Sequence, residues 1–393
     1  MFPAPFRQLT PLLAAVGLTA LCAPTPSRAA TMTLYGILDN GMNYVGNEGG
    51  HADTKLVSGT MSSNRWGVKG EDTLSGGWRT VFTLENGFDL NSGKIQQNSR
   101  LFGRQAWLGL SKSDVGTVTL GRQWDVFGDL LWDGNASNTF GSWMATHPAD
   151  IDNLDSTYKS NQSIKFISAP LHGWRAGASY AFGNTPDALS RDQIISMALR
   201  YDRPSWTLAA GWISFNRPNL SAWDGTAQSV GVLTVAPTIA GGYASARQQT
   251  VAAIMGIYRH DHWTFAGSFS HTRFSGLGSD AGPNPAGFRD DVLFYNIEGN
   301  ARYQMTRALS IGGFYHFTWG RPHDGQAGVR YHQVGASVDY ALSKQLDVYA
   351  LAQYQRAAGI DSSGATARAN IDGLALSSSA QQSVARIGMR YRF

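Results

Sequence analysis

Basic side chains occupy alternate positions in a short segment near the N-terminal third of the sequence. In residues 65–70, Arg65 and Lys69 alternate with Trp66 and Val68. Because successive side chains of a β-strand point to opposite faces, the two cations share one face and the two apolar side chains share the other. Fixed cations along an aqueous passage create a field that biases the entry of ions. The pattern therefore predicts a charged wall that selects ions.

Two further segments extend this charged face. In residues 78–85 the apolar positions are Trp78, Phe82 and Leu84. Glu85 then falls on the charged face. In residues 104–110 the outward positions are expected to be Gln105, Trp107 and Gly109. That assignment points Arg104 toward the charged face. Two interpretations stay open, because Arg65 and Arg104 either set ion selectivity or only pair with Glu85.

Composition restricts how such segments could cross a membrane. Of 393 residues, 15% are charged, 11% are aromatic and 45 are glycine. No stretch after residue 30 approaches the roughly 18 to 20 apolar residues that a membrane helix needs. A chain of this kind that spans a bilayer must do so as a closed β-barrel. The formal net charge of +4 is too balanced to predict a nucleic-acid partner.

The N-terminus has the features of a secretory signal peptide. Arg7 precedes an apolar run at 12–23, and Ser27, Arg28 and Ala29 form a small-x-small cleavage site. We therefore predict a signal peptide at 1–29 and a single mature domain at 30–393, exported through the periplasm. The sole cysteine, Cys22, lies within the signal, so the mature chain offers no thiolate ligand or redox thiol.

Period-two alternation recurs along the whole mature chain and predicts sixteen strands. The expected short turns are 71–77, 111–116, 169–173, 202–205, 259–262, 304–308 and 341–344. The longer connections, rich in Gly, Pro, Ser and Asn, are about 125–158, 217–246, 275–289 and 357–380. Short turns on one rim and long loops on the other are typical of outer-membrane barrels. The predicted fold class is all-β, a transmembrane antiparallel β-barrel of sixteen strands.

Tryptophans occur at equivalent places after several of the short turns. These are Trp78, Trp174, Trp206 and Trp263. Trp prefers the membrane–water interface, where its ring and its N–H are both accommodated. The four positions predict an aromatic girdle on the short-turn rim.

Several motifs together resemble the trimeric, sixteen-stranded general porins of Gram-negative outer membranes, of the betaproteobacterial type. The motifs are Leu34-Tyr35-Gly36-Ile37-Leu38-Asp39, Ser63-Asn64-Arg65-Trp66-Gly67-Val68-Lys69-Gly70, Phe82-Thr83-Leu84-Glu85, Arg104-Gln105-Ala106-Trp107-Leu108-Gly109-Leu110, Gly116-Thr117-Val118-Thr119-Leu120-Gly121-Arg122-Gln123 and the terminal Phe393. They cover the first third of the barrel and its last strand, while the middle of the chain matches mainly in rhythm.

The resemblance implies that the third loop, about 125–158, folds into the pore and narrows it. Phe140 and Gly141 resemble the tip of that loop, and Lys159 then joins Arg65 and Arg104 in a basic arc. Enteric relatives oppose this arc with acids on the loop. The aligned positions here are Asn135 and Thr139, although Asp129 and Asp133 stand nearby. Loss of the opposing carboxylates predicts a preference for anions.

The resemblance also implies partners. Arg122 shares parity with Val118 and Leu120, so it should point outward, where the family uses an arginine to contact a neighbouring subunit. Phe393 is expected to contribute to the subunit contact and to recognition by the barrel-assembly machinery. The implied assembly is a homotrimer in the outer membrane, surrounded by lipid and lipopolysaccharide, which passes small ions and solutes.

Other chemistries were weighed against a channel. The sequence His260-Asp261-His262 lacks identifiable further metal ligands, and Asp150, Asp152 and Asp155 lack the glycine and glutamate spacing of a calcium loop. The acidic stretch is therefore expected to be solvated. Nucleophile and phosphate-loop motifs are absent from the sequence, so no enzyme activity, metal or cofactor is predicted.

Two alternatives to a general channel stay open. In the first, a channel specific for a sugar or an aromatic acid uses Trp132, Phe140 and Trp143 as a stacking surface, although these side chains could instead pack the loop. In the second, the barrel anchors an adhesin.

Overall fold

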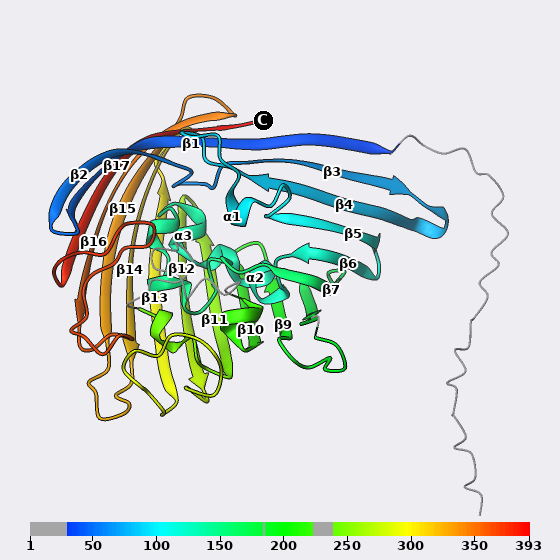
Figure 1. Ribbon diagram of the computed structural model, residues 1–393. Coiled ribbons are helices and arrows are strands. Elements are labelled where there is room, and N and C mark those ends of the chain that lie inside the picture. The colour runs from blue at the N-terminus through cyan, green and yellow to red at the C-terminus, as the bar shows by residue number, and fades with distance from the viewer. Residues whose placement is uncertain (1–29, 184, 223–238) are drawn as a thin grey trace, which may run out of the picture.

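The computed structural model describes residues 30–183, 185–222 and 239–393 (Figure 1). The predicted signal peptide at 1–29 lies outside these residues. Within them, seventeen strands form one sheet. The strands are β1 (Thr31–Glu48), β2 (His51–Ser58), β3 (Arg65–Thr73), β4 (Trp78–Gly87), β5 (Gln105–Lys112), β6 (Gly116–Gln123), β7 (Ser160–Ser168), β8 (Trp174–Ala181), β9 (Ile194–Asp202), β10 (Trp206–Asn216), β11 (Gln248–His260), β12 (Trp263–Ser275), β13 (Val292–Gln304), β14 (Leu309–Gly320), β15 (Arg330–Ala341), β16 (Leu346–Ala358) and β17 (Gln381–Arg392).

Antiparallel pairing closes the sheet into a barrel. Residues Ile37 to Val45 of β1 pair with β17. On its other edge, β1 pairs with β3 from Thr31 to Ile37 and with β2 from Asn40 to Glu48. β2 and β3 thus fill one place in the ring, and the seventeen strands of the described chain occupy sixteen positions. The predicted sixteen-stranded antiparallel barrel is confirmed, and its closure leaves no unpaired edge for hydrocarbon to meet.

Connections alternate in length, as the sequence predicted. Two residues, 261–262, join β11 to β12, and three residues, 203–205, join β9 to β10. The connection from β6 to β7 instead runs over 124–159, and that from β16 to β17 over 359–380. Because the strands are antiparallel, the short turns lie on one rim and the long loops on the other, apart from the two-residue turn 49–50 between β1 and β2, which lies on the loop rim.

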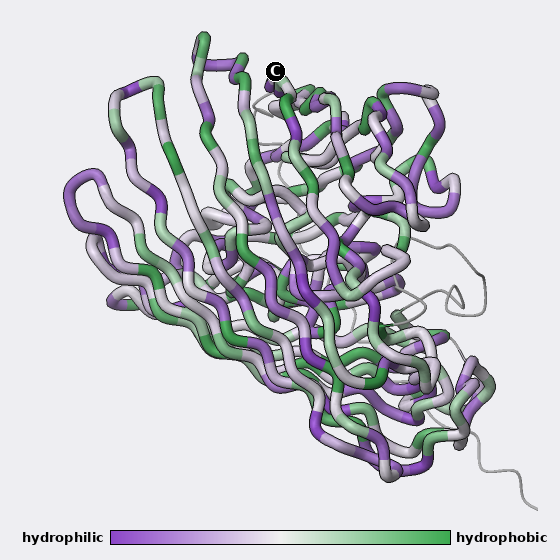
Figure 2. The backbone as a smooth tube through the Cα atoms, turned by 90° about the vertical axis from the view of Figure 1, so that its left-hand side faces the viewer, coloured by the Kyte–Doolittle hydropathy of each residue, from purple (hydrophilic) through white to green (hydrophobic). Residues whose placement is uncertain are grey.

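The two faces of the barrel differ in polarity along each strand (Figure 2). In β17, Ile387 and Met389 are 68% and 58% exposed, whereas Arg386 and Arg390 are 1% and 8% exposed. The apolar side chains point outward and the arginines point into the barrel. This alternation follows from the pleat of a strand whose two faces meet hydrocarbon and water.

Aromatic pairs mark the short-turn rim. Trp174, Trp206 and Trp263 are the first residues of β8, β10 and β12. Each stacks on a tyrosine of the next strand. The centroid distances are 4.6 Å from Trp174 to Tyr201, 4.3 Å from Trp206 to Tyr258 and 4.6 Å from Trp263 to Tyr303. These exposed pairs form the girdle that the sequence predicted, at the depth where amphipathic rings are most stable.

The connection 124–159, the third loop, lies inside the barrel, as expected (Figure 1). Its helices are α2 (Val126–Leu131), η2 (Trp132–Gly134), α3 (Ala136–Thr139), η3 (Trp143–Ala145) and η4 (Pro148–Asp150). The other helices of the described residues are η1 (Ser75–Gly77), α1 (Gln96–Ser99), α4 (Pro218–Ser221) and η6 (Gly241–Tyr243). None of the described helices is long and apolar enough to span a membrane.

Two wall glycines allow the third loop to approach the barrel closely. A Cβ at Gly211 of β10 would lie 2.8 Å from the ring of Phe127 in α2. A Cβ at Gly312 of β14 would lie 2.5 Å from the ring of Phe140. Phe127 and Phe140 are buried at these contacts. The loop therefore rests on the wall through aromatic side chains that only glycine admits.

Candidate pore constriction

The carboxylates at the start of the third loop pair with the wall beneath it. Asp129 Oδ2 lies 2.5 Å from Lys165 Nζ on β7. Asp133 accepts two hydrogen bonds from the guanidinium of Arg200 on β9, at 2.6 and 2.8 Å. Bidentate contacts of this kind fix orientation as well as distance. Both acids that the sequence placed in the constriction therefore have their charges matched by neighbouring cations.

The far end of the loop is fastened by a buried acid–base cluster. His147 Nδ1 lies 2.7 Å from Asp152 Oδ2, and His147 Nε2 lies 3.4 Å from Glu298 Oε2 on β13. Ser270 and Asn296 donate hydrogen bonds to the same Asp152 oxygen, at 2.5 and 3.1 Å. All five side chains are buried. The loop is thus tied to β12 and β13 through polar groups that water does not reach.

This cluster holds a proton on His147. Burial alone lowers the pKa of the imidazole, but the carboxylates of Asp152 and Glu298 outweigh burial and raise the pKa of His147 to about 10. The ring of His316 on β14 packs edge-on against His147, with 5.0 Å between the ring centroids. At neutral pH the imidazolium of His147 therefore pairs with Asp152. We call the following residues the anchoring cluster: Asp129, Asp133, Lys165, Arg200, His147, Asp152 and Glu298.

A different set of charges surrounds Glu85 on β4. Arg104 Nε lies 2.7 Å from Glu85 Oε1, and Tyr35 donates its hydroxyl to Glu85 Oε2 at 2.8 Å. Arg65 Nε approaches the same Oε2 to 3.8 Å. Glu85 and Arg104 are buried, while Arg65 is half-buried. The structure thus brings together three of the predicted site residues, and one carboxylate faces two guanidinium groups.

Lys159 extends this arc through the indole of Trp124. The ring of Trp124 lies 5.4 Å from the Arg104 guanidinium and 5.8 Å from Lys159 Nζ. Desolvation, together with the cations Arg104 and Arg122, lowers the pKa of Lys159 to about 7. Lys159 also donates hydrogen bonds to the carbonyls of Ser156 and Thr157. We call Arg65, Arg104, Lys159 and Glu85 the basic cluster.

Lys69 lies on the same face of β3 as Arg65. The register pairs Lys69 with Thr33 and Arg65 with Ile37 on β1, in line with inward-pointing Tyr35. Lys69 Nζ is 5.5 Å from the Tyr35 ring centroid, and its side chain is exposed. Arg65, Lys69 and Glu85 thus share the inward face, with Lys69 nearer the short-turn rim, and their part in a pore constriction stays a prediction.

The predicted faces of β5 are wrong. Leu108 and Leu110 are 56% and 47% exposed on the outside, so Gln105, Trp107 and Gly109 point inward. Register agrees, since Trp107 pairs with Thr83 and Gln105 with Glu85. Arg104 precedes the strand, and its side chain reaches the lumen from the bend before β5. The alternation of side chains within β5 does not predict the direction of Arg104, because the backbone turns at the residue before the strand.

Arg122 and Phe393 lie at places consistent with the sequence prediction. Arg122 pairs across the sheet with Ala106, on the outward face. Its guanidinium donates to the Gly103 carbonyl at 2.8 Å and to Asn161 Oδ1 at 2.5 Å, both in its own chain. Phe393 exchanges backbone hydrogen bonds with Gly36 and helps to close the barrel. Their part in a subunit contact stays a prediction.

The third loop presents uncharged side chains to water. Trp132 is 48% exposed and Thr139 is also exposed. Asn135 is buried and accepts a hydrogen bond from Ser268 at 2.7 Å. Phe140 is buried beside Phe314, so it packs the loop instead of offering a stacking surface. Trp143 is half-buried, which leaves Trp132 as the exposed aromatic of the predicted three.

The sequence predicted that Asp150, Asp152 and Asp155 form a solvated stretch, which is wrong for Asp150 and Asp152, while Asp155 is half-buried. Asp150 and Asp152 are 2% and 0% exposed. Asp150 accepts backbone hydrogen bonds from Asp155 at 3.0 Å and from Thr157 at 2.9 Å. The carboxylate therefore stabilises a turn at the end of the loop. Asp150 and Asp152 are buried because the third loop crosses the lumen, and the local sequence contains no signal of that burial.

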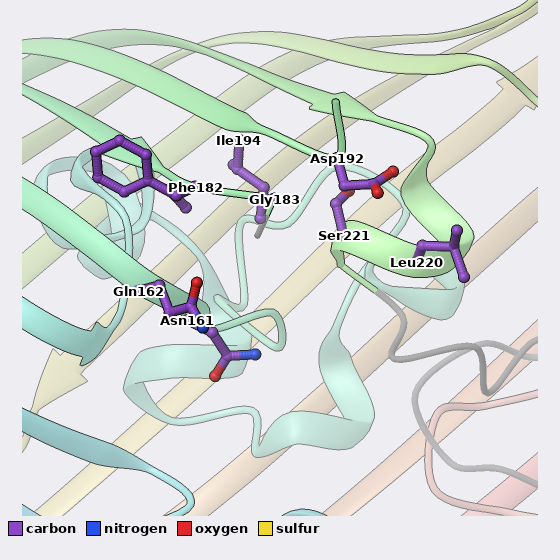
Figure 3. A pocket seen from close by; sticks show the side chains of 9 residues that line it. Asn161, Gln162, Phe182, Gly183, Asp192, Ile194, Leu220 and Ser221 are labelled. Carbon is purple, nitrogen blue, oxygen red and sulfur yellow. The ribbon is translucent and has the colours of Figure 1, made fainter. Parts of the chain in front are cut away.

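Two further polar features of the described chain lie apart from these clusters. His260 and Asp261 are exposed side chains at the turn after β11. Figure 3 shows a pocket at the loop rim, which Asp192 and Ser221 help to line. Asp192 is already paired with Arg217 at 2.5 Å. The pocket therefore adds no unmatched charge to the channel.

Several contributors to the site were not predicted from sequence. Tyr35 has inward parity and could have been found from alternation. Alternation gives no comparable signal for the other contributors, because their partners come from other elements of the chain. These contributors are Trp124, Lys165, Arg200 and His147. In the lumen, Asp129, Asp133 and Asp152 of the loop pair with cations inside the anchoring cluster. At the basic cluster, three basic side chains outnumber the single carboxylate of Glu85.

Comparison with known proteins agrees with this architecture. The family model described as Gram-negative porin matches residues 14–359. An outer membrane porin protein of Bordetella pertussis is 28% identical over 254 residues, which make up 56% of this chain and 64% of that protein. The chain thus spans less than two thirds of the length of this curated relative.

Solved structures share the fold. An anion-selective porin from Comamonas acidovorans superimposes with a TM-score of 0.70 at 19% identity, over 93% of this chain and 100% of that one. The outer membrane protein OmpT of Vibrio cholerae, in a trimer form, gives a TM-score of 0.64 at 16% identity, over 93% and 100% of the two chains.

Proposed function

Because the chain belongs to the Gram-negative porin family, we propose that it forms a water-filled channel in the outer membrane for passive diffusion of ions and small hydrophilic solutes, with a preference for anions. The observation that carries the preference is the charge balance at the basic cluster. There, Arg65 and Arg104 share one carboxylate, Glu85, and Lys159 adds a third cation across the ring of Trp124.

The loop's own carboxylates support the same conclusion. Asp129 and Asp133 are engaged by Lys165 and Arg200, so they contribute little field toward the basic cluster. The most exposed side chains of the loop, Trp132 and Thr139, carry no charge, while Asp129 and Asp133 are each 25% exposed and paired with a cation. A positive arc opposite a neutral loop lowers the free energy of an anion in the passage more than that of a cation. The solved neighbour named for anion selectivity shares the fold at 19% identity, and the preference proposed for this chain rests on its own residues.

A solute-specific channel for aromatic acids is the second candidate. Exposed Trp132 offers a ring to a planar solute, and the nearby lumen supplies cations for a carboxylate. This candidate predicts that benzoate reduces chloride current at concentrations at which acetate does not. Equal effects of the two anions would reject it.

A homotrimer is the assembly that we propose. The outward faces of β1 and β17 carry large exposed apolar side chains, including Leu34, Met42 and Ile387. Arg122 lies at the loop rim with outward parity, where a neighbouring subunit could add contacts to those it already makes. Chemical cross-linking of the folded protein in detergent should give a ladder that ends at three subunits.

Reconstitution into a planar lipid bilayer tests the channel itself. Insertion of the purified, folded chain should produce stepwise increases in conductance, and voltage-induced closures should group in threes. Heat-denatured protein in the same detergent is the matched control. Folded protein that inserts without raising the conductance of the bilayer would contradict the proposal.

A further inference from the structure

A cluster of cations lies on the outside of the barrel, at the loop-rim ends of β15 and β16. The register pairs His332 with Arg356 and places Arg330 one outward position further toward the rim. Arg330 and His332 point outward, because they share parity with the exposed residues that follow them on β15, namely Val334, Ala336 and Val338. Cross-strand neighbours on one face lie about 5 to 8 Å apart. The three basic side chains therefore form one patch.

The two arginines of this patch have no protein partner. Arg330 and Arg356 are exposed, and neither makes an ion pair or side-chain hydrogen bond with any residue in the described ranges. By contrast, Arg273, outward on β12, pairs with Asp291. The outward positions of β14, β15 and β16 contain no carboxylate. A fixed positive charge at this edge of the barrel is left for an external anion.

Aromatic rings border the patch and hold its histidine. The hydroxyl of Tyr315 on β14 lies 2.7 Å from His332 Nδ1. Phe317 stacks on His332, with 4.4 Å between the ring centroids. Trp319 stands opposite Arg330 in the register of β14 and β15. Rings and cations in adjacent rows are the composition of a membrane–water boundary.

The height of the patch agrees with that boundary. Tyr340 marks the short-turn end of β15, and Arg330 is ten residues away along the strand. Ten residues of strand span about 33 Å, which becomes about 25 Å along the membrane normal at the usual tilt of a barrel strand. The apolar band of outer-membrane barrels is about 25 Å tall. Arg330 and Arg356 thus reach the head-group layer of the outer leaflet.

We propose that Arg330, His332 and Arg356 bind a phosphate group of a phosphorylated glycolipid of the outer leaflet, of the lipid A type. A guanidinium presents paired N–H donors that match phosphate oxygens, and two arginines side by side neutralise its charge. The apolar rows of Val334, Ala336 and Ala352 below the patch would contact the acyl chains of the same lipid. This partner is separate from the solutes of the proposed channel.

Binding of purified lipid A to the folded full-length protein tests the site. We would measure affinity by native mass spectrometry or by calorimetry in detergent, for the wild type and for the double variant Arg330→Gln/Arg356→Gln. The double variant should bind lipid A about tenfold or more weakly, because two charge-assisted contacts are lost. The variant Arg79→Gln/Lys112→Gln, which removes two cations at the short-turn rim, should bind as the wild type does.

Lipid chemistry provides further arms of the experiment. Dephosphorylated lipid A should bind the wild type as weakly as lipid A binds the double variant. Equal binding of lipid A to wild type and double variant would overturn the site. Equal binding of phosphatidylglycerol and lipid A to the wild type would also overturn the site. The same holds for a double variant that binds lipid A as the wild type does but dissociates into monomers. Single-channel conductance of the double variant should match the wild type, which separates failure of this site from failure of the channel.

Discussion

The two charged clusters in the lumen use the same kinds of side chain to different ends. In the anchoring cluster, Asp129 and Asp133 each meet a cation within 2.6 Å, and the charges cancel where the loop touches the wall. In the basic cluster, Glu85 is shared by Arg104 and Arg65, and Lys159 adds a further cation. Matched charges fix a loop in position, whereas unmatched charges produce a field in the water beside them.

The largest effect is expected from breaking the anchoring cluster at Asp152. In Asp152→Ala the imidazolium of His147 keeps only its longer contact with Glu298, and an underpaired buried charge typically costs about 3–5 kcal/mol. We expect a lower denaturant midpoint in detergent and a noisier, larger single-channel current as the loop loosens. The isosteric Asp152→Asn retains hydrogen-bonding capacity and should show a smaller change. Quiet, unchanged currents in Asp152→Ala would show that the loop is held elsewhere.

Alkaline pH should release the same contact without mutation. The folded pKa of His147, about 10, lies above the ordinary value of 6.5. The stabilisation from its proton is therefore fully present below about pH 6.5 and is lost as pH rises through about 10. Channel noise should increase near that upper value in the wild type. Asp152→Ala, whose loop is already loosened, should show a weaker pH dependence, and a wild-type channel indifferent to alkaline pH would contradict the pairing.

Charge changes in the basic cluster should alter selectivity in opposite directions. Arg65→Gln removes a half-buried cation and should lower the chloride-to-potassium permeability ratio about fivefold, equivalent to about 1 kcal/mol at the distances and dielectric of a pore wall. Glu85→Gln removes the only carboxylate of the cluster and should raise the ratio. Reversal potentials in a KCl gradient report both changes. Shifts of the same sign in both variants would show that the wall field does not set selectivity.

A smaller, pH-dependent effect is expected from Lys159. Its pKa of about 7 means that the charge is present in mildly acidic solution and disappears as pH rises through neutrality. Anion preference should therefore fall by a factor of about two between pH 6 and pH 8. Lys159→Arg keeps its charge over this range and should remove the dependence. A pH profile shared by wild type and Lys159→Arg would assign the titration to another group.

Alternation made much of this structure predictable from sequence. A strand that separates hydrocarbon from water must alternate, so the inward faces of Arg65, Lys69 and Glu85 followed directly. The prediction was wrong at β5, where Trp107 was placed on the outward face together with Gln105 and Gly109. The alternation of Leu108 and Leu110 indicated the correct outward face of β5. The inward face can hold Trp107, because a lumen wide enough for water also accommodates an indole ring.

Loop contacts were beyond sequence reasoning for a physical reason. Asp129 and Lys165 are separated by 36 residues, and His147 and Glu298 by 151. Their pairing depends on how the third loop crosses the lumen, which no local periodicity encodes. The burial of Asp150 and Asp152 has the same origin, since the solvent that surrounds an isolated acidic stretch is replaced here by the barrel wall.

The zero-current potential of the wild-type channel in a KCl gradient near pH 6 tests the central claim most directly, because it reports the sign of the lumen field on mobile ions. The cations Arg65, Arg104 and Lys159 outnumber the carboxylate of Glu85. We therefore expect a zero-current potential whose sign shows that chloride is more permeant than potassium. A potential of the opposite sign, with potassium favoured, would contradict this account of the basic cluster.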